Sequence, residues 1–99
     1  MMWRHGDVMI AAVAEIPTGA RRRPGQVLAR GEVTGHSHRV AEIGAAELWE
    51  AMGLTYLTIT AETATLIHDE HKPIVLPHGT YRFWQQREYT PQAIRRVVD

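Results

Sequence analysis

Short apolar runs and alternating apolar and polar positions dominate this chain, and glycine or proline interrupts them at roughly eight- to twelve-residue intervals. This spacing is typical of a small all-β sandwich or barrel, in which turns join short strands. Stripes with helical periodicity are few. The pattern therefore predicts an all-β fold, a small barrel or jelly roll of about eight short strands.

Turn residues divide the chain into the expected strands. Thr34-Gly35 and Pro77-His78-Gly79 are typical turn sequences, because glycine admits a positive φ and proline fixes its own φ. Arg21-Arg22-Arg23 precedes Pro24-Gly25 and is expected to be an exposed basic loop. The predicted strands cover residues 7–15, 26–33, 36–43, 54–60, 63–68, 73–76 and 81–85.

Residues 47–52 admit two interpretations. Their Ala, Glu, Leu and Met residues favour a helix, but the β-branched and aromatic segment 54–60 follows directly. We expect a strand here, with Met52-Gly53 as the hairpin turn. Thr90-Pro91 has the pattern of a helix start, so a short C-terminal helix is expected over about residues 91–98.

The composition limits the classes of function. The 99 residues suit one domain, 1–99, and 11 basic residues balance 11 acidic ones, so no global field attracts nucleic acid or an anionic membrane. Cysteine is absent, which excludes disulfides and thiolate metal sites. Any metal must be held by His, Asp or Glu. The longest apolar run, from Val8 to Ala14, is too short to span a bilayer, and we expect a cytoplasmic protein.

The candidate chemistry lies in the six histidines. His36 and His38 occupy positions i and i+2, so on a strand both rings project from one face, about 6–7 Å apart. Two imidazoles in this arrangement can share a zinc, iron, nickel or copper ion. The alternative is that a His-Ser-His segment is only polar turn material.

A second pair, His68 and His71, flanks Asp69-Glu70. If Asp69-Glu70 is a two-residue hairpin tip, the two histidines face each other across the ladder with Cβ atoms about 5 Å apart. If the loop is longer, the two rings diverge. The further ligand candidates are Glu42, His78, Asp69 and Glu70, whereas His5 is expected at the surface.

Two other sets of residues have a candidate role. Tyr81, Gln85 and Arg87 share one face of the last predicted strand and could line a ligand pocket. The alternative is an exposed edge strand with Trp84 packed beneath the C-terminal helix. Arg21-Arg22-Arg23, with Arg95-Arg96, could form a phosphate-binding patch, or simply a solvated surface.

The segment from Gly31 to Gly44 resembles the first cupin motif, in which a glycine precedes His-x-His and a glutamate follows. This resemblance implies His36, His38 and Glu42 as metal ligands. Pro77-His78-Gly79 is similar to part of the second cupin motif, but Arg82 stands where that motif has its histidine, so His68 or His71 is the expected fourth ligand. The whole chain, through GEVTGHSH, LPHGTY and QREYTP, also resembles short uncharacterised bacterial and phage proteins.

These observations predict a small metal-binding β-barrel protein that holds a divalent transition metal, zinc, iron or nickel. The predicted ligands are His36, His38, His68 and His71. Three histidines with an open position would support hydrolytic or oxygenase-type chemistry on a small-molecule ligand, whereas four would close the site, so the sequence leaves open whether the protein is an enzyme. The alternative hypothesis is a non-enzymatic adaptor that binds protein or nucleic acid through its arginines; a homo-oligomer is compatible with both.

Overall fold

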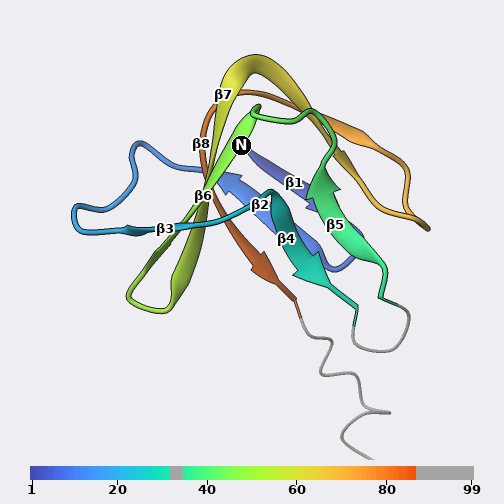
Figure 1. The fold of residues 1–99 in the computed structure, drawn as a ribbon, viewed down its shortest axis with the longest axis horizontal. Helices are drawn as coiled ribbons and strands as arrows, with labels where there is room; N and C mark the ends of the chain where they lie inside the picture. Colours follow the sequence, from blue (N-terminus) through green and yellow to red (C-terminus); the bar gives the residue numbers. More distant parts are fainter. Residues whose placement is uncertain (32–34, 87–99) are drawn as a thin grey trace, which may run out of the picture.

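The computed structural model describes residues 1–31 and 35–86, which form an all-β fold (Figure 1). The described part of the chain contains eight antiparallel strands and no helix, so it has no helix that could cross a membrane. The predicted all-β class with about eight strands is confirmed. The predicted C-terminal helix over residues 91–98 and Arg87 lie outside the described residues. The strands are β1 (Met2–His5), β2 (Val8–Ala12), β3 (Arg21–Arg23), β4 (Val27–Arg30), β5 (Ser37–Val40), β6 (Ala46–Ala51), β7 (Leu54–Ile67) and β8 (Ile74–Gln85).

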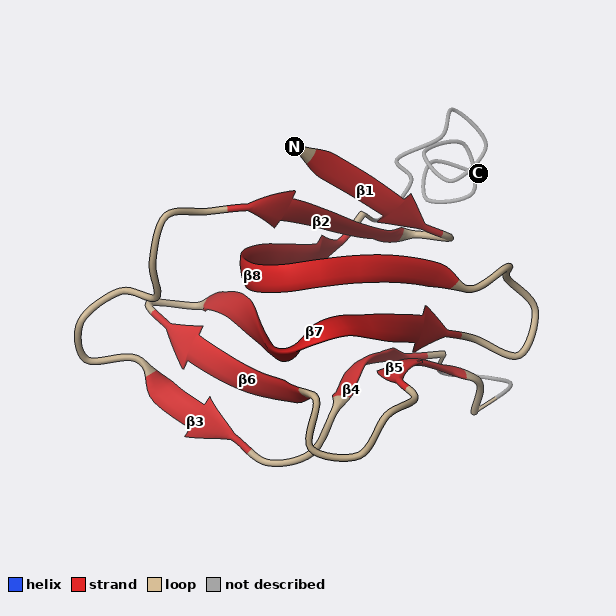
Figure 2. Ribbon diagram, turned by 90° about the horizontal axis from the view of Figure 1, so that it is seen from above, coloured by secondary structure: helices blue, strands red, loops and turns tan. Residues whose placement is uncertain are grey.

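The long hairpin of β7 and β8 organises the sheet. Along one path the strand order is β1-β2-β8-β7-β5-β4, while β6 also pairs with β7 and carries β3 on its outer edge. β6 pairs with the first half of β7 and β5 with its end, as Figure 2 shows. The register of β7 against β8 shifts between Ile59 and Thr63, an irregularity that bends both strands. The sheet thus curls around a single interior face.

The sheet is not closed into a barrel, which corrects the predicted barrel. Among the described residues, the path ends at β1 on one side and at β4 on the other, and these two strands are not paired. β4 covers only Val27–Arg30, and its register against β5 is itself irregular. So short an edge strand does not reach the opposite edge of the sheet.

Strand alternation places the core on the concave face. In β2, Val8 and Ile10 are buried while Met9 is partly exposed, and in β6 the same holds for Ala46 and Leu48 against Glu47. The edge of the Trp3 ring packs against Tyr81. Burial of these apolar side chains is the main force that holds the curled sheet together. The core consists of Val8, Ile10, Leu28, Val40, Ala45, Ala46, Leu48, Leu57, Ile59, Ala64, Leu66, Leu76, Tyr81 and Phe83.

Several predicted strand limits change. Segment 47–52 is a strand, as expected, and its turn has positive φ at both Met52 and Gly53, as a type I′ hairpin requires. Predicted strands 54–60 and 63–68 are one strand, β7, and 73–76 and 81–85 belong to β8, so Pro77-His78-Gly79 lies inside a strand rather than in a turn. β1, with the sequence MWRH, is an additional strand that was not predicted.

Candidate metal centre

Five of the six histidines meet at one end of the curled sheet. His5 ends β1, His36 precedes β5, His38 lies within β5, and His68 and His71 lie between β7 and β8. We call these five residues the histidine cluster. The ring centroids of His38 and His68 are 4.4 Å apart and those of His68 and His71 are 4.5 Å apart. The cluster therefore unites the two pairs that the sequence singled out.

Three members of the cluster converge closely enough that they could hold a metal ion. His38, His68 and His71 each offer one ring nitrogen, and these nitrogens all lie within 4.8 Å of one another. Zinc–nitrogen bonds of about 2.0–2.1 Å in a tetrahedral site place ligand nitrogens about 3.4 Å apart. The most widely separated nitrogens must therefore approach by up to about 1.4 Å to bind one zinc ion. His71 is exposed and His68 is only partly buried, so both have room to rotate.

The loop between β7 and β8 is longer than a two-residue tip, which corrects the predicted register. The last ladder pair is Leu66 with Ile74, so His68 and His71 both lie in the loop rather than opposite each other on strands. The rings nevertheless stay together. The backbone N–H of Glu70 donates to Nδ1 of His68 at 3.0 Å, which folds the loop over.

His71 is held against the turn between β1 and β2. Gly6 in this turn has φ +62°, and a Cβ built there would lie 2.5 Å from Nε2 of His71. Only glycine leaves room for the ring at this distance and also adopts this φ without strain. A glycine far away in the sequence thus leaves room for a candidate ligand.

His5 is the member of the cluster that sequence reasoning missed. It was expected at the surface, but it is 2% exposed, and its Nδ1 lies 2.9 Å from Nδ1 of His38. Because β1 pairs with β2, His5 lies opposite the buried Val8 and faces the interior. A signal was present in the sequence: Trp3 and His5 alternate into the face that Val8 and Ile10 continue.

The hydrogen bonds around His5 and His38 determine where their protons lie. Nε2 of His5 donates to the carbonyl oxygen of Lys72 at 3.0 Å, and Nε2 of His38 donates to Oδ1 of Asp7 at 3.1 Å. A carbonyl and a carboxylate only accept, so both Nε2 atoms carry the hydrogen. In neutral rings both Nδ1 atoms are then bare lone pairs, and they face each other at 2.9 Å. Two lone pairs at this distance repel each other. A third proton shared by the two Nδ1 atoms, or a metal cation, would remove the repulsion.

Burial opposes the third proton. Desolvation, with the neighbouring His68 and His5, lowers the pKa of His38 from 6.5 to about 4. Desolvation also lowers the pKa of His5. Burial acts to raise the pKa of Asp7, but its hydrogen bonds, first that from Gln85 at 2.6 Å, lower it overall. The neutral imidazoles beside an ionised carboxylate keep the lone pairs that a metal requires.

His36 lies at the margin of the cluster. Its ring centroid is 5.8 Å from that of His68, and its Nδ1 lies 2.6 Å from Oε1 of Glu70. His36 is absent from the group of three described residues whose ligand atoms converge. Among the described residues His38 thus converges with the two loop histidines, while His36 as a metal ligand stays a prediction.

The spare ligands predicted from the sequence are engaged elsewhere. Both carboxylate oxygens of Glu42 accept hydrogen bonds from Thr65, which lowers the pKa of Glu42. His78 is exposed and its Nδ1 bonds the carbonyl oxygen of Ala61 at 3.2 Å. Asp69 accepts a hydrogen bond from Arg39 at 3.2 Å. The glutamate that the cupin resemblance implies as a ligand thus does not join the three converging histidines.

Of the predicted pocket residues Tyr81, Gln85 and Arg87, the structure describes the first two and places them in different surroundings. Tyr81 is 2% exposed, belongs to the core and donates its hydroxyl hydrogen to the carbonyl oxygen of Pro77. Gln85 lines a different pocket, together with residues such as Leu28 and Phe83.

The basic segment Arg21-Arg22-Arg23 is a strand rather than the predicted loop. It forms β3, where Arg22 pairs with Glu47 at 3.3 Å and lies over the ring of Trp49.

The fold and the cluster define an open antiparallel β-sheet protein with converging histidines at one end. Residues 4–86 match the model of a family described as Domain of unknown function (DUF8820), so the chain belongs to this family. The match includes every histidine of the cluster. No curated protein and no solved structure matches the chain. The function must therefore be argued from the site itself.

Proposed function

We propose that the protein binds one divalent transition metal ion through the histidine cluster, with His38, His68 and His71 as ligands. One observation carries this proposal: three ring nitrogens from two separate parts of the chain lie within 4.8 Å of one another. Imidazole nitrogen suits zinc, iron, nickel and copper. Of these, zinc is the natural first probe, because it accepts a tetrahedral set of nitrogen ligands.

The protonation pattern supports a cation at this position. The facing Nδ1 lone pairs of His5 and His38 repel each other in the neutral state, and the buried surroundings disfavour a proton between them. A metal ion on the Nδ1 side of His38 would remove this repulsion. Asp7 would then keep its hydrogen bond to Nε2 and orient the ring, as carboxylates behind metal-bound histidines do.

The number of ligands decides the chemistry. With three histidine ligands, a fourth position on the metal would be open, where water or a small-molecule ligand could bind. A metal-bound water there would lose its proton near neutral pH, which is the basis of hydrolytic chemistry. If His5 also coordinates through its Nδ1, the site is closed and the metal is structural.

The alternative hypothesis, an adaptor that binds its partner through arginines, has no comparable structural support, because Arg22 already interacts with Glu47 and Trp49.

A titration calorimetry experiment tests the metal proposal. The protein, made without an affinity tag and stripped with a chelator, is titrated with Zn²⁺, Ni²⁺ and Fe²⁺. We expect one ion per chain, with at least a tenfold loss of affinity in His68→Ala and in His71→Ala.

The matched control is His78→Ala. This histidine is also exposed but lies outside the cluster, so its loss should leave zinc affinity unchanged. His5 is unsuitable as a surface control because it is buried against His38. Equal zinc affinity in the parent, His68→Ala and His71→Ala would refute the proposal.

A further inference from the structure

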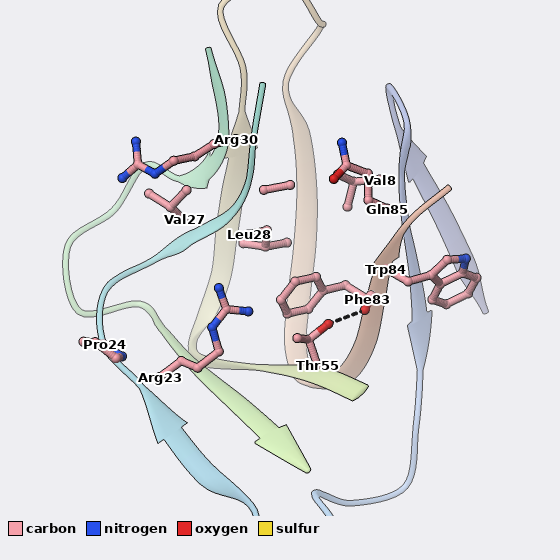
Figure 3. A pocket seen from close by; sticks show the side chains of 11 residues that line it. Val8, Arg23, Pro24, Val27, Leu28, Arg30, Thr55, Phe83, Trp84 and Gln85 are labelled. Carbon is pink, nitrogen blue, oxygen red and sulfur yellow. Dashed lines mark hydrogen bonds between the residues drawn. The ribbon is translucent and has the colours of Figure 1, made fainter. Parts of the chain in front are cut away.

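A pocket of about 500 Å³ opens where the sheet fails to close (Figure 3). Its walls come from β4 on one side and from the paired strands β2 and β8 on the other, and among the described residues β4 pairs with neither of these two strands. Leu28 and Phe83 form apolar walls and are 5% and 4% exposed. The size lies within the range of about 300–1,000 Å³ found for small-molecule sites.

Arg23 supplies a positive charge to this pocket. It pairs in register with Leu48, a fully buried core residue, so both side chains lie on the interior face of the sheet. Figure 3 shows the Arg23 side chain pointing into the pocket, towards Leu28, whereas Trp84 points away. Arg22, the preceding residue, projects from the opposite face to Glu47 and Trp49.

No counter-charge accompanies Arg23. Among residues 1–31 and 35–86, no hydrogen bond or ion pair to its guanidinium is found, and no Asp or Glu lines the pocket. Thr55 in the wall is already engaged, since its hydroxyl donates to the carbonyl oxygen of Phe83 at 2.6 Å. Arg23 is only partly buried, so its guanidinium stays accessible to a ligand, and its fork matches the two oxygens of a carboxylate or phosphate.

We propose that this pocket binds a small molecule that carries an anionic head group on a flat apolar body. Arg23 binds the head group, a carboxylate or a phosphate, while Leu28 and Phe83 contact the apolar body. The proposal does not rest on the metal centre, although the two sites share a wall. Val8 and Ala29 line the pocket and pair in register with His5 and His38.

Three probes with the same apolar body test this proposal: 2-naphthoate, 2-naphthyl phosphate and the neutral 2-naphthamide. Binding to the full-length, chelator-stripped protein is measured by titration calorimetry or NMR, so that no probe can bind through a metal ion. We expect at least one of the two anions to bind tighter than the amide by tenfold or more. The tighter anion identifies the head group.

Two arginine variants show which arginine binds the anionic head group. In Arg23→Gln the preferred anion should lose at least tenfold in affinity while the amide stays within about twofold, because a charge-assisted hydrogen bond is lost. Arg22→Gln removes the same charge from the outer face and should change neither. If Arg23→Gln does not fold, Arg23→Lys is used, which keeps the charge but lacks the fork and should also weaken the anion.

Other outcomes overturn the proposal. The amide could bind as tightly as both anions, or neither anion could bind at millimolar concentration. Equal losses of anion affinity in Arg22→Gln and Arg23→Gln would also contradict it. In each case the zinc titration is unaffected, so failure of this pocket and failure of the metal centre are distinguishable.

Discussion

Strand β3 and the histidine cluster are both rich in a single residue type, but their surroundings differ. The side chain of Arg22 is 51% exposed and pairs with the partly exposed Glu47 on the same sheet. His5 and His38 are 2% and 4% exposed and contact residues from other parts of the chain. The charge of Arg22 is balanced locally and hydrated. The histidines are brought together from distant segments, and two of them, His5 and His38, are buried. This convergence makes the cluster a candidate site.

The largest expected effect is on stability in the presence of metal. A ligand that binds only the folded state at a thousandfold excess over its Kd stabilises that state by about 4 kcal/mol. For a chain of this size the melting temperature should rise by more than about ten degrees when zinc is added to the stripped protein. Differential scanning calorimetry checks this, with His78→Ala behaving like the parent. A shift that persists in His68→Ala and His71→Ala would place the effect outside the cluster.

The second effect is a pH dependence of the metal-free protein. The pKa of His38 lies at about 4 in the folded state, below its ordinary 6.5. As the pH falls, the unfolded chain therefore takes up the proton first, and stability is lost between about pH 6.5 and pH 4. The free energy of unfolding should fall by at most about 3 kcal/mol over this range. Asp7 adds its own loss chiefly below its ordinary pKa of 3.8.

Urea unfolding at several pH values measures this effect. His38→Gln cannot take up a proton and should show a flatter profile between pH 6.5 and pH 4. The β3 variant Arg22→Gln should keep the profile of the parent. Identical profiles for the parent and His38→Gln would mean that His38 does not carry the pH dependence.

A third prediction separates backbone strain from support of a ligand. Gly6→Ala and Gly25→Ala both place a side chain at positive φ, +62° and +81°, and each should cost about 1–2 kcal/mol of stability. Only at Gly6 does the new Cβ strike His71, whereas nothing lies within 4 Å at Gly25. Zinc affinity should therefore fall in Gly6→Ala alone. Equal affinities in both variants would show that the position of His71 is unimportant for binding.

The smallest expected effect is the loss of stability when the Arg22 charge on β3 is removed. The ion pair between Arg22 and Glu47 is well exposed, and such pairs contribute less than about 1 kcal/mol. Thermal unfolding of Arg22→Gln should differ from the parent by only a few degrees, and 0.5 M salt should reduce the difference. A large, salt-independent loss would mean that β3 is as tightly coupled to the core as the histidine cluster is.

Local patterns in the sequence predicted much of the fold. The strand over residues 47–52 and the Met52-Gly53 turn follow from β-propensity and positive φ, both of which are local properties. Closure of the sheet could not be predicted, because it depends on how far β7 and β8 bend and whether β4 reaches β1. For the same reason the pocket in the gap was not foreseen.

The candidate site also contains residues that local spacing predicts and residues whose position depends on long-range contacts. The sequence predicted the pairs containing His38 and His68–His71 from spacing alone. It missed His5, whose place depends on β1 pairing with β2, and the support of His71 by Gly6, which depends on contact between distant turns. The sequence pattern predicts an exposed basic loop at Arg23, whereas Arg23 lies in strand β3. Its inward direction became visible only through its register with Leu48.

Imidazole ¹⁵N NMR during a zinc titration tests the central claim most directly, because it observes each ring nitrogen. With one equivalent of zinc, the account predicts shifts typical of metal-bound nitrogen in His38, His68 and His71. In His38 the metal should bind Nδ1 while Nε2 keeps its hydrogen towards Asp7. His78 should not change. Zinc shifts in His78, or none in His38, His68 and His71 at one equivalent, would contradict the account.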